Sequence, residues 1–598
     1  MKQTIAALLA AALPALSTTA ANDGIENGVH GYTPKNYVRP KEPAVLERLE
    51  WFKDQKLALM MCFGLYSNIG IIESWCLSDA AARWSRREVA WTKDSDEFKR
   101  QYWGLIRSFN PIRFEPRKWA KTAKDCGFRY VLFTTKQHDG FCLYDSKFSD
   151  YKVTAPECPF STDARADVAK HVFDAFRAEG LGIAAYFSKP DWHNADYWEG
   201  RGIGRRTTRY PTYDVKRNPE KWARFRDFTK NQIVELVRDY GKIDIIWLDG
   251  GQVQRKTGLD IKIEEIIAEA RKYNPALISV DRTAGGPCEN VVTPEQAVPK
   301  TPIAVPWESC ITIGKWWGYH FEDEYKPVRQ IVHTLIDIVA KGGNLALNVG
   351  PQPDGRLPHQ AVERMEALGA WLKVNGEAIY GTRPLPPFRK GDWAFTKNRR
   401  TGAEYAIRLW KENEKRTVRQ TIPDTFVSKV IHIGNRTEFP CEINADGAVF
   451  NLPDSFKSDA SADVFRITRR DELDVRPYGP ALAGIDECRI SLFLLNGKIG
   501  TRLHVDFFDE AKANAAKALY EAEKPLASSR SVMEENLARA KAQGNQGDIA
   551  RTEMALGWMD GLKVDFKGKT LLVDTGLIDA RQFFTVMAEP LAGTLEMF

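Results

Sequence analysis

Short apolar runs alternate with helical patterns between about residue 45 and residue 382. The runs are rich in β-branched and aromatic residues, as buried strands are; they read LALMMCFGLYS (57–67), YVLFTTKQHDG (130–140), GIAAYFSKPDW (182–192), DIIWLDGG (244–251), LISVDRTAGG (277–286), AVPWESC (304–310) and NLALNVGP (344–351). Several of the helical stretches between them end in glycine, a common helix terminator. Alternating strands and helices predict a parallel sheet with crossover helices. Seven strands over this length favour a (β/α)8-like TIM barrel, with one unit degenerate, over an open sheet.

Polar side chains gather at the carboxyl end of these runs. They are Tyr66, Ser67, Gln137, His138, Asp191, Trp192, Asp249, Arg282, Glu308 and Asn348. Because parallel strands in a barrel end at one face, and barrel active sites are built at that face, we expect these side chains to converge there. Their repeated placement is stronger evidence for a site than any single residue.

The pattern changes twice after the barrel segment. Short alternating runs with turns, such as WAFTKN, EYAIRLW and VSKVIHIGN, predict an antiparallel β-sandwich. The remaining chain has strand-like runs on either side of long stretches rich in Ala, Glu, Lys and Arg, which predicts a small C-terminal α/β extension. The predicted domains are a catalytic barrel at 22–384, a β-sandwich at 385–478 and a C-terminal α/β domain of unassigned role at 479–598.

Residues 1–21 have the pattern of a secretory signal peptide. Lys2 precedes an apolar run from Ile5 to Leu16, and small residues follow it. That run is too short to span a bilayer, and no later run approaches about 18 apolar residues. We therefore expect an exported protein, periplasmic or secreted, without a membrane span. An oxidising compartment would permit a disulfide such as one between Cys62 and Cys76.

Composition and charge narrow the class of protein. The chain is 43% hydrophobic and 27% charged, which is typical of a folded soluble protein. A net charge of +6 over 598 residues gives no case for a nucleic-acid partner, which would require a concentrated basic face. The nine histidines are dispersed, no group has metal-ligand spacing, and no GxSxG or GxGxxG motif follows a strand. We expect neither a metal nor a cofactor.

Asp249 is the first candidate for catalysis. It follows a buried run and precedes two glycines that would let a substrate approach. Trp247, two residues earlier in the strand, points to the same side. A carboxylate beside an aromatic wall at a barrel mouth suits a glycosidase nucleophile. The alternative is an aspartate that caps the loop, and placement alone favours neither.

A retaining glycosidase needs a second carboxyl group about 5–5.5 Å from the first. Glu308 is favoured, because burial at the end of its strand would raise its pKa for acid catalysis. Glu289 is the reserve, and Glu73 is a further candidate. The alternative role for Glu308 is an ion pair with Arg282 or Lys315.

Aromatic residues are frequent near the strand ends, where sugar rings would stack. They are Trp75, Trp192, Trp247, Trp307, Trp316, Trp317 and Tyr319. Singly such residues are more often part of a core, and His138 alone is more often a satisfied structural histidine. Only their grouping favours a carbohydrate site.

Several long motifs, in order, carry a family resemblance. They are WFKDQKLALMMCFGLYS, FEPRKWAKTAKDCGFRYVLFTTKQHDGFCLYDSK, IIWLDGG, VDRTAGG, WESCITIGKWWGY, GGNLALNVGPQPDG and WLKVNGEAIYGTRP. From about residue 51 to 382 the sequence resembles the α-L-fucosidases of glycoside hydrolase family 29, and more faintly through the β-sandwich. The C-terminal domain lies outside the family pattern.

The resemblance implies an exo-acting retaining hydrolase that releases terminal α-L-fucose from an oligosaccharide or glycoconjugate through a covalent glycosyl-enzyme. It implies that Asp249 is the nucleophile and that Glu308, in a WE-S-C motif, is the acid/base. It implies sugar contacts by His138, Tyr186, Trp247, Arg282, Glu73 and Trp75, and Cys62, Gln137, Trp316 and Trp317 complete the predicted substrate-binding set.

Two positions depart from the family pattern. The first strand ends in Cys62-Phe63-Gly64 where the family has His-Trp-Gly, and Gln137-His138 replaces a His-His pair. In the family those histidines bind ring hydroxyls, so α-L-galactose or a sulfated or otherwise modified L-sugar is an alternative substrate. The basic run WSRREVAW could favour an anionic or sulfated glycan as substrate. The alternative is that it is a solvent-exposed surface stretch with no role in binding. A catalytically weak glycan-binding relative is the alternative from another class.

Overall fold

A computed structural model describes residues 37–80, 82–86, 92–414, 417–424, 427–444 and 446–469, strand segments between 485 and 579, and a few helical residues between 534 and 553. The chain forms two compact units, Asn22–Arg469, and Met1–Ala21 together with Arg470–Phe598. The predicted signal peptide lies outside the described residues. Within the described part, no helix is both long enough and apolar enough to cross a membrane.

The first unit is built on a seven-stranded parallel sheet in the order β5-β4-β3-β2-β1-β7-β6. Its strands are β1 (Leu57–Met61), β2 (Tyr130–Lys136), β3 (Gly182–Ser188), β4 (Ile245–Asp249), β5 (Ile278–Asp281), β6 (Glu308–Thr312) and β7 (Asn344–Val349). Nearly every strand residue is buried, as expected when one face packs inside a barrel and the other under helices. The prediction of a parallel (β/α) barrel is confirmed.

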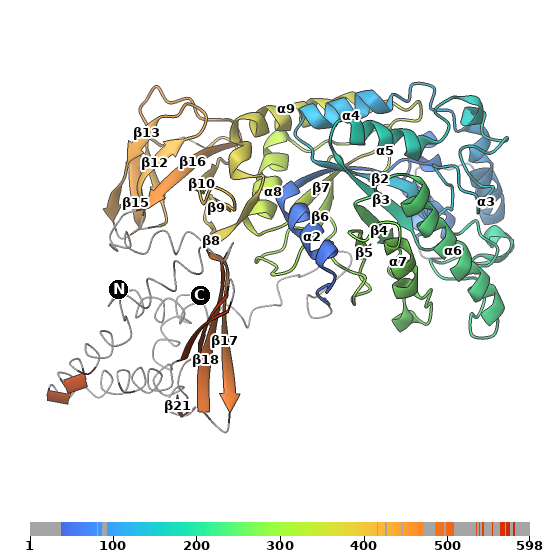
Figure 1. The fold of residues 1–598 in the computed structure, drawn as a ribbon. Coiled ribbons are helices and arrows are strands. Elements are labelled where there is room, and N and C mark those ends of the chain that lie inside the picture. Colours follow the sequence, from blue (N-terminus) through green and yellow to red (C-terminus); the bar gives the residue numbers. More distant parts are fainter. Residues whose placement is uncertain are drawn as a thin grey trace. The chain divides into compact units, whose positions relative to one another are not determined.

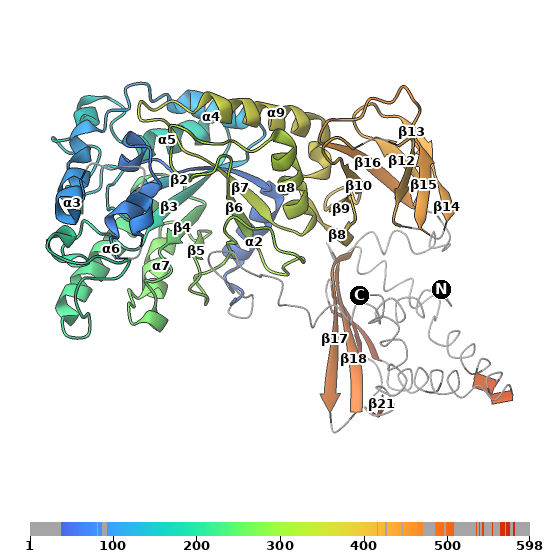
Figure 2. The same cartoon turned by 180° about the vertical axis from the view of Figure 1, so that it is seen from behind.

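Helices cover the outside of the sheet (Figure 1, Figure 2). They are α2 (Pro43–Gln55), α3 (Ser95–Trp103), α4 (Pro116–Asp125), α5 (Val168–Ala178), α6 (Pro219–Asp239), α7 (Ile263–Arg271), α8 (Val328–Ala340) and α9 (His359–Asn375). Three of them begin with proline. Proline lacks an N–H, but the N–H groups of a first helical turn have no acceptor within the helix, so no hydrogen bond is lost. The helices bury apolar faces against the strands, which leaves the carboxyl ends of the strands for the site.

The edge strands β5 and β6 are joined by an irregular segment, residues 288–296. The N–H of Asn290 donates to the carbonyl of Ser279 in β5 (2.9 Å), and the N–H of Cys310 in β6 donates to the carbonyl of Pro294 (3.1 Å). The segment therefore occupies the place of an eighth strand. Proline has no N–H to donate to a ladder, which explains why this stretch lacks a regular strand pattern.

An antiparallel β-sandwich completes the first unit. Its strands are β8 (Thr382–Lys390), β9 (Trp393–Asn398), β10 (Glu404–Leu409), β11 (Arg419–Ile422), β12 (Val427–His432), β13 (Glu438–Pro440), β14 (Glu442–Asn444), β15 (Gly447–Asn451) and β16 (Ala462–Arg469). They form a sheet in the order β13-β12-β16-β10-β9-β8 and a second one in the order β11-β15-β14. Phe395 and Phe465 from the first sheet pack with Phe450 from the second. Trp371 in α9 donates to the carbonyl of Ala462 (3.0 Å), which fixes the sandwich to the barrel.

The second unit contains an antiparallel sheet, of which β17 to β20 overlap the predicted strand-like runs and β21 was not predicted. They are β17 (Ile485–Leu495), β18 (Lys498–Phe507), β19 (Lys563–Lys567), β20 (Thr570–Asp574) and β21 (Ile578–Asp579). The helical stretches predicted between β18 and β19 lie almost entirely outside the described residues.

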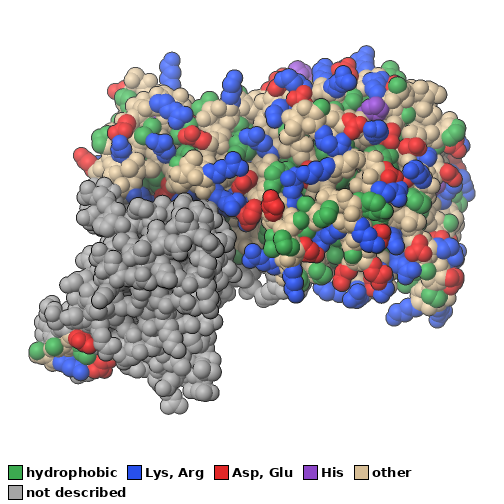
Figure 3. Space-filling model, viewed as in Figure 1, with side chains coloured by type: hydrophobic (Ala, Val, Ile, Leu, Met, Phe, Trp, Pro, Cys, Tyr) green, Lys and Arg blue, Asp and Glu red, His purple; other side chains and the backbone are tan. Residues whose placement is uncertain are grey.

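Charged side chains of both signs are interspersed over the face of the first unit seen in Figure 3. Lysines and arginines there alternate with aspartates and glutamates instead of forming one basic field. This distribution matches the modest net charge of the sequence.

Glu308 lies at the amino end of the barrel, away from the predicted site. It is the first residue of β6 and pairs in register with Asn344, the first residue of β7. Its carboxylate accepts a hydrogen bond from Tyr130, the first residue of β2. The predicted position at the carboxyl end of a strand is wrong, because the strand begins at Glu308 and continues to Thr312 instead of ending at Cys310.

This position predicts a pH-dependent effect on stability. Burial raises the pKa of Glu308 from 4.5 to about 7, although the hydrogen bond from Tyr130 opposes the shift. The folded state therefore holds this proton more tightly than the unfolded state, and the contribution of Glu308 to stability falls as pH rises from about 4.5 to about 7. We expect Glu308→Gln, which cannot ionise, to become more stable relative to the parent by up to about 3 kcal/mol across this range.

Urea unfolding followed by tryptophan fluorescence at several pH values measures this difference. A difference in unfolding midpoint that stays constant with pH would contradict the assignment of a buried, protonated Glu308.

Candidate active site

A cavity of about 410 Å³ lies at the carboxyl face of the barrel. Its lining comes from the ends of the strands and the loops that follow them. The sequence-predicted residues that line it are Cys62, Glu73, Trp75, Gln137, His138, Tyr186, Trp247, Asp249, Arg282 and Trp317. The structure thus brings together residues from six strands, β1 to β6, and the loops that follow them.

Three sequence-predicted residues lie elsewhere. Glu308 is at the amino end of the barrel. Glu289 is buried beside the cavity, and its carboxylate accepts hydrogen bonds from the N–H groups of Thr283 (3.1 Å) and Gly285 (2.6 Å). Trp316 stacks on a neighbouring histidine side chain, with ring centroids 5.5 Å apart, and does not line the cavity. Burial raises the pKa of Glu289 to about 8, and its carboxyl oxygens already hold the loop after β5.

Asp249 ends β4, and its carboxylate is held from two sides. Tyr186 in β3 donates a hydrogen bond to Oδ2 (2.6 Å), and Nη1 of Arg282 donates to Oδ1 (3.1 Å). Burial alone would raise the pKa of Asp249, but the charge of Arg282 and the hydrogen bond from Tyr186 outweigh it and hold that pKa well below its usual range. Asp249 is therefore ionised, as a nucleophile must be.

Glu295 is a second carboxylate in the cavity lining. Nη2 of Arg282 donates to Glu295 while Nη1 donates to Asp249, so one guanidinium bridges both groups. The guanidinium also lies over the ring of Trp247, 5.2 Å from its centroid. Two carboxylates that face one sugar-sized cavity form the constellation that glycoside hydrolysis uses.

Glu73 and His138 add neutral polar groups to the lining. Burial, together with the negative charges of Glu295 and Asp249, raises the pKa of Glu73 well above its usual range, so its carboxyl group is protonated. Burial lowers the pKa of His138 to about 4 in spite of the nearby Asp249, so its ring is neutral at pH 7. Nε2 of His138 lies 3.8 Å from Oδ2 of Asp249. Both groups can hydrogen bond to sugar hydroxyls without adding charge.

Gln137 is committed to contacts within the protein. Its Oε1 lies 2.8 Å from the hydroxyls of Tyr186 and Ser188 and accepts from the N–H of His138 (3.1 Å). Ser188 also contacts Nδ1 of His138 at 2.7 Å. Gln137 therefore positions Tyr186 and His138, which both lie near Oδ2 of Asp249.

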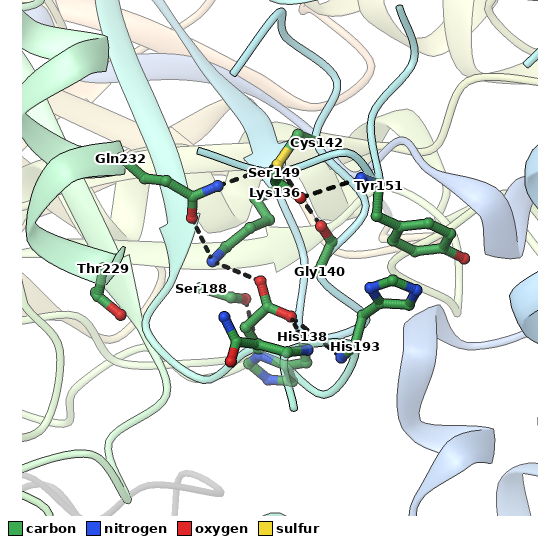
Figure 4. A network of polar contacts seen from close by, with 12 residues as sticks. Lys136, His138, Gly140, Cys142, Ser149, Tyr151, Ser188, His193, Thr229 and Gln232 are labelled. Atoms are coloured by element: carbon green, nitrogen blue, oxygen red, sulfur yellow. Dashed lines mark hydrogen bonds and ion pairs between the residues drawn. The ribbon is translucent and has the colours of Figure 1, made fainter. Parts of the chain in front are cut away.

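A buried polar network supports this edge of the site (Figure 4). Nζ of Lys136 donates to Gln232 in α6 (2.9 Å) and to Asp191 after β3 (3.1 Å). Asp191 accepts in turn from the N–H of His193 (3.1 Å). The sequence places Lys136 at the end of a buried strand, and the network satisfies its charge there.

Two glycines allow the loops to approach this closely. Gly140 has φ +80°, and a Cβ there would meet Oδ1 of Asp191 at 2.2 Å. Gly250 has φ +91°, and a Cβ there would meet Pro190 at 2.2 Å. Both positions require the left-handed backbone that glycine alone adopts without strain. The turn directly after Asp249 therefore depends on Gly250.

The floor of the cavity is apolar and rich in sulfur. Met60, Cys62 and Cys310 line it beside Trp247. Burial raises the pKa of the Cys62 thiol well above its usual range, so the thiol is neutral. Cys62 and Cys76 are both free, so the disulfide suggested for this pair is not formed.

Two charged residues of the lining, Glu295 and Arg209, are not among the residues predicted from the sequence. Glu295 follows an apolar pair, Val291 and Val292, as polar residues follow the other strands, but Pro294 hides the strand-like character of this segment. Arg209 belongs to a long irregular loop after β3, where no periodic signal distinguishes it from its neighbouring arginines.

Comparison with known proteins identifies the scaffold. A family model described as Alpha-L-fucosidase matches residues 29–377. The chain is 27% identical to the plasma α-L-fucosidase of Rattus norvegicus over 349 residues, which are 56% of this chain and 70% of that protein. It is 25% identical to the human tissue α-L-fucosidase over 469 residues, 72% of this chain and 91% of that protein.

Solved structures agree with this assignment. The α-L-fucosidase isoenzyme 1 from Paenibacillus thiaminolyticus is 28% identical, with a TM-score of 0.59 over 72% of this chain and 100% of that chain. A family 29 α-L-fucosidase from Bacteroides thetaiotaomicron has the same fold at 23% identity, with a TM-score of 0.58 over 74% of this chain and 98% of that chain. Because the family model covers more than half of the sequence, the chain belongs to the α-L-fucosidase family, glycoside hydrolase family 29, and is an α-L-fucosidase-like glycoside hydrolase.

Proposed function

We propose that this protein is an exo-acting, retaining hydrolase that releases terminal α-L-fucose, or a closely related L-sugar, from an oligosaccharide or glycoconjugate. The observation that carries the proposal is the pair of carboxylates, Asp249 and Glu295, that Arg282 bridges in the cavity. Membership of the α-L-fucosidase family supports the sugar class.

Asp249 is the nucleophile in this proposal. Its low pKa keeps it ionised, and Tyr186 and Arg282 fix one oxygen each. The carboxylate attacks C1 of the sugar and forms a glycosyl ester, with inversion at that carbon. Water then attacks C1 from the side the leaving group vacated, and the second inversion restores the original configuration.

Glu295 is the acid/base in this proposal, in place of Glu308. Glu308 does not line the cavity, and its carboxylate contacts Tyr130 at the amino end of the barrel. Glu295 in its protonated form can give a proton to the leaving oxygen. Once Asp249 is esterified its negative charge is gone, the like-charge repulsion on Glu295 disappears, and the same group can act as a base toward water.

The lining supports a deoxy sugar. Fucose differs from L-galactose by a methyl group in place of a hydroxymethyl group, and the floor formed by Met60, Cys62 and Cys310 is apolar. A buried hydroxyl would need a partner there, whereas a methyl group would not. α-L-Galactose remains the alternative substrate that the departures at Cys62 and Gln137 suggest.

A glycan-binding protein with little catalysis is the alternative from another class. The low pKa of Asp249 and the bridging of two carboxylates argue against it, because binding alone does not require an ionised nucleophile beside a second carboxylate. The signal-peptide pattern of residues 1–21 supports export, to the periplasm or beyond the cell.

Replacing the nucleophile gives the first test of this function. We expect the parent protein to release nitrophenol from 4-nitrophenyl α-L-fucoside, and Asp249→Ala to lose on the order of 10⁴-fold or more of kcat. Azide can enter the vacated space and attack C1 once, so it should restore turnover and yield the inverted β-fucosyl azide. The azide's anomeric configuration is read by NMR, and Asp214→Ala, at an aspartate paired with Arg217 outside the cavity lining, is the control.

Full activity in Asp249→Ala would refute the nucleophile. A higher kcat/KM for 4-nitrophenyl α-L-galactoside would replace fucose with L-galactose. Cleavage of neither glycoside, with glycan binding intact, would favour the binding protein.

The acid/base is tested by comparing Glu295→Gln with Glu308→Gln. We expect Glu295→Gln to lose about 10²- to 10⁴-fold in kcat/KM on fucosyl disaccharides and far less on 2,4-dinitrophenyl fucoside, whose leaving group needs no proton. Azide should then intercept the ester on Asp249 and give the retained α-fucosyl azide. Glu308→Gln should stay within about tenfold of the parent on both substrates, and the reverse pattern would return the role to Glu308.

A further inference from the structure

We propose that Arg209 forms a binding site for an anionic group, a sulfate ester or a carboxylate, carried by the substrate. The inference rests on the proposed glycosidase function and adds a substrate class to it. Arg209 lines the same cavity as Asp249 and Arg282 and is partly exposed there. It comes from the long loop that follows β3.

The backbone around Arg209 is fixed by buried partners. Its carbonyl accepts hydrogen bonds from the hydroxyl of Tyr197 (2.7 Å) and from Nε2 of Gln252 (3.3 Å). The next carbonyl, of Tyr210, accepts from Nε1 of Trp198 (2.9 Å). Tyr197 and Trp198 are fully buried. The side chain of Arg209 therefore starts from a defined position at the cavity.

The guanidinium of Arg209 rests on an aromatic platform. Its Cζ lies 4.9 Å from the ring centroid of Trp75. Trp75 is itself held edge-on against His138 (5.3 Å) and Trp192 (5.5 Å). A guanidinium in contact with an aromatic ring keeps its N–H donors available for a planar acceptor such as a carboxylate, or for the oxygens of a sulfate.

No carboxylate of the described residues lies within ion-pair distance of Arg209. Two arginines nearby show the contrast: Arg282 is bound to Asp249 and Glu295, and Arg205, on the same loop, pairs with Glu199 at 2.7 Å. Among the described residues, Arg209 is thus a cation that faces the cavity beside an aromatic ring and without a carboxylate at ion-pair distance.

The charge balance of the cavity favours an anionic ligand. The first catalytic step needs Glu295 protonated, and in that state the ionised groups of the lining are Asp249, Arg282 and Arg209. Asp249 offsets one arginine, so one positive charge remains. A bound sugar would remove water from the cavity, and an anion on the substrate would offset the lost hydration of Arg209 with charge-assisted hydrogen bonds.

The structure describes only the first part of the basic run WSRREVAW, up to Arg86. Within it, Arg86 donates to the carbonyl of Cys76 (2.5 Å) and to the hydroxyl of Ser95 (3.1 Å). Residues 87–91 lie outside the described part of the chain. Among the described residues, the arginine that lines the cavity beside Arg282 is Arg209, from the loop after β3.

Matched neutral and anionic substrates test the inference. One arm compares 4-nitrophenyl α-L-fucoside with its 2-, 3- and 4-O-sulfates, and a second compares fucosyl-glucose with fucosyl-glucuronic acid. For each arm, the ratio of kcat/KM, anionic over neutral, is measured in the parent, Arg209→Gln and Arg209→Lys. We expect Arg209→Gln to lower this ratio about tenfold or more for at least one anionic substrate, and Arg209→Lys to keep part of it.

Arg206→Gln is the matched control, because Arg206 is an exposed arginine on the same loop that does not line the cavity. Its ratios should equal those of the parent. A fall in the ratio for the O-sulfates indicates that Arg209 binds a sulfate on the fucose. A fall for fucosyl-glucuronic acid indicates that it binds a carboxylate on the neighbouring sugar. Added salt should weaken the preference in the parent more than in Arg209→Gln.

The outcomes separate this inference from the proposed function. Equal ratios in the parent and Arg209→Gln, with the neutral fucosides cleaved, would overturn the anion site and leave the hydrolase standing. Calorimetric binding of methyl α-L-fucoside and its sulfates is measured in parallel. If no substrate is cleaved, tighter binding of a sulfated than of an unsulfated methyl fucoside, lost in Arg209→Gln, still supports the anion site. Equal binding of the sulfated and unsulfated fucosides overturns the anion site. No binding of any of them overturns both proposals.

Discussion

The site depends on one guanidinium that bridges two carboxylates. Arg282 binds Asp249 through Nη1 and Glu295 through Nη2. Without that positive charge, two carboxylates in a buried cavity would repel each other, and one of them would hold a proton regardless of its role. The bridge fixes both groups in space, and the charge of Arg282 keeps Asp249 ionised. The position of Arg282 directly after β5, and of Glu295 on the segment that joins β5 to β6, follows from the way the barrel closes.

The polar ends of the strands are possible only because buried charges have partners there. Lys136 is matched by Asp191 and Gln232, and Lys189 by Asp281, in contacts with almost no exposure to solvent. Removing one partner would leave an uncompensated charge, which costs several kcal/mol in a protein interior. These pairs hold the loops after β2, β3 and β5 at the cavity. They explain why the polar clusters of the sequence contain more charges than the chemistry uses.

Sequence patterns predicted the strands and Asp249 but not the second carboxylate. Apolar runs locate buried strands well, and a carboxylate after such a run is easily recognised. Apolar runs do not distinguish the start of a five-residue strand from its end. Glu308 is therefore predicted at the carboxyl end of its strand, whereas it is the first residue of β6. Glu295 follows a similar apolar pair, yet Pro294 removes the strand signal, and only pairing with β6 reveals the geometry. Arg209 reaches the cavity through loop contacts made far along the chain, which no local pattern encodes.

The two departures from the family pattern have different physical meanings. The side-chain oxygen of Gln137 contacts Tyr186, Ser188 and His138. In the proposed function Gln137 therefore affects sugar binding mainly by positioning the residues around Asp249. Cys62 is a neutral thiol on an apolar floor, where a methyl group fits better than a hydroxyl. We therefore infer that this floor sets the preference between a methyl and a hydroxymethyl group on the sugar. The proposed anion site at Arg209 lies on a different loop, so in this proposal the scaffold can keep its chemistry while its glycan changes.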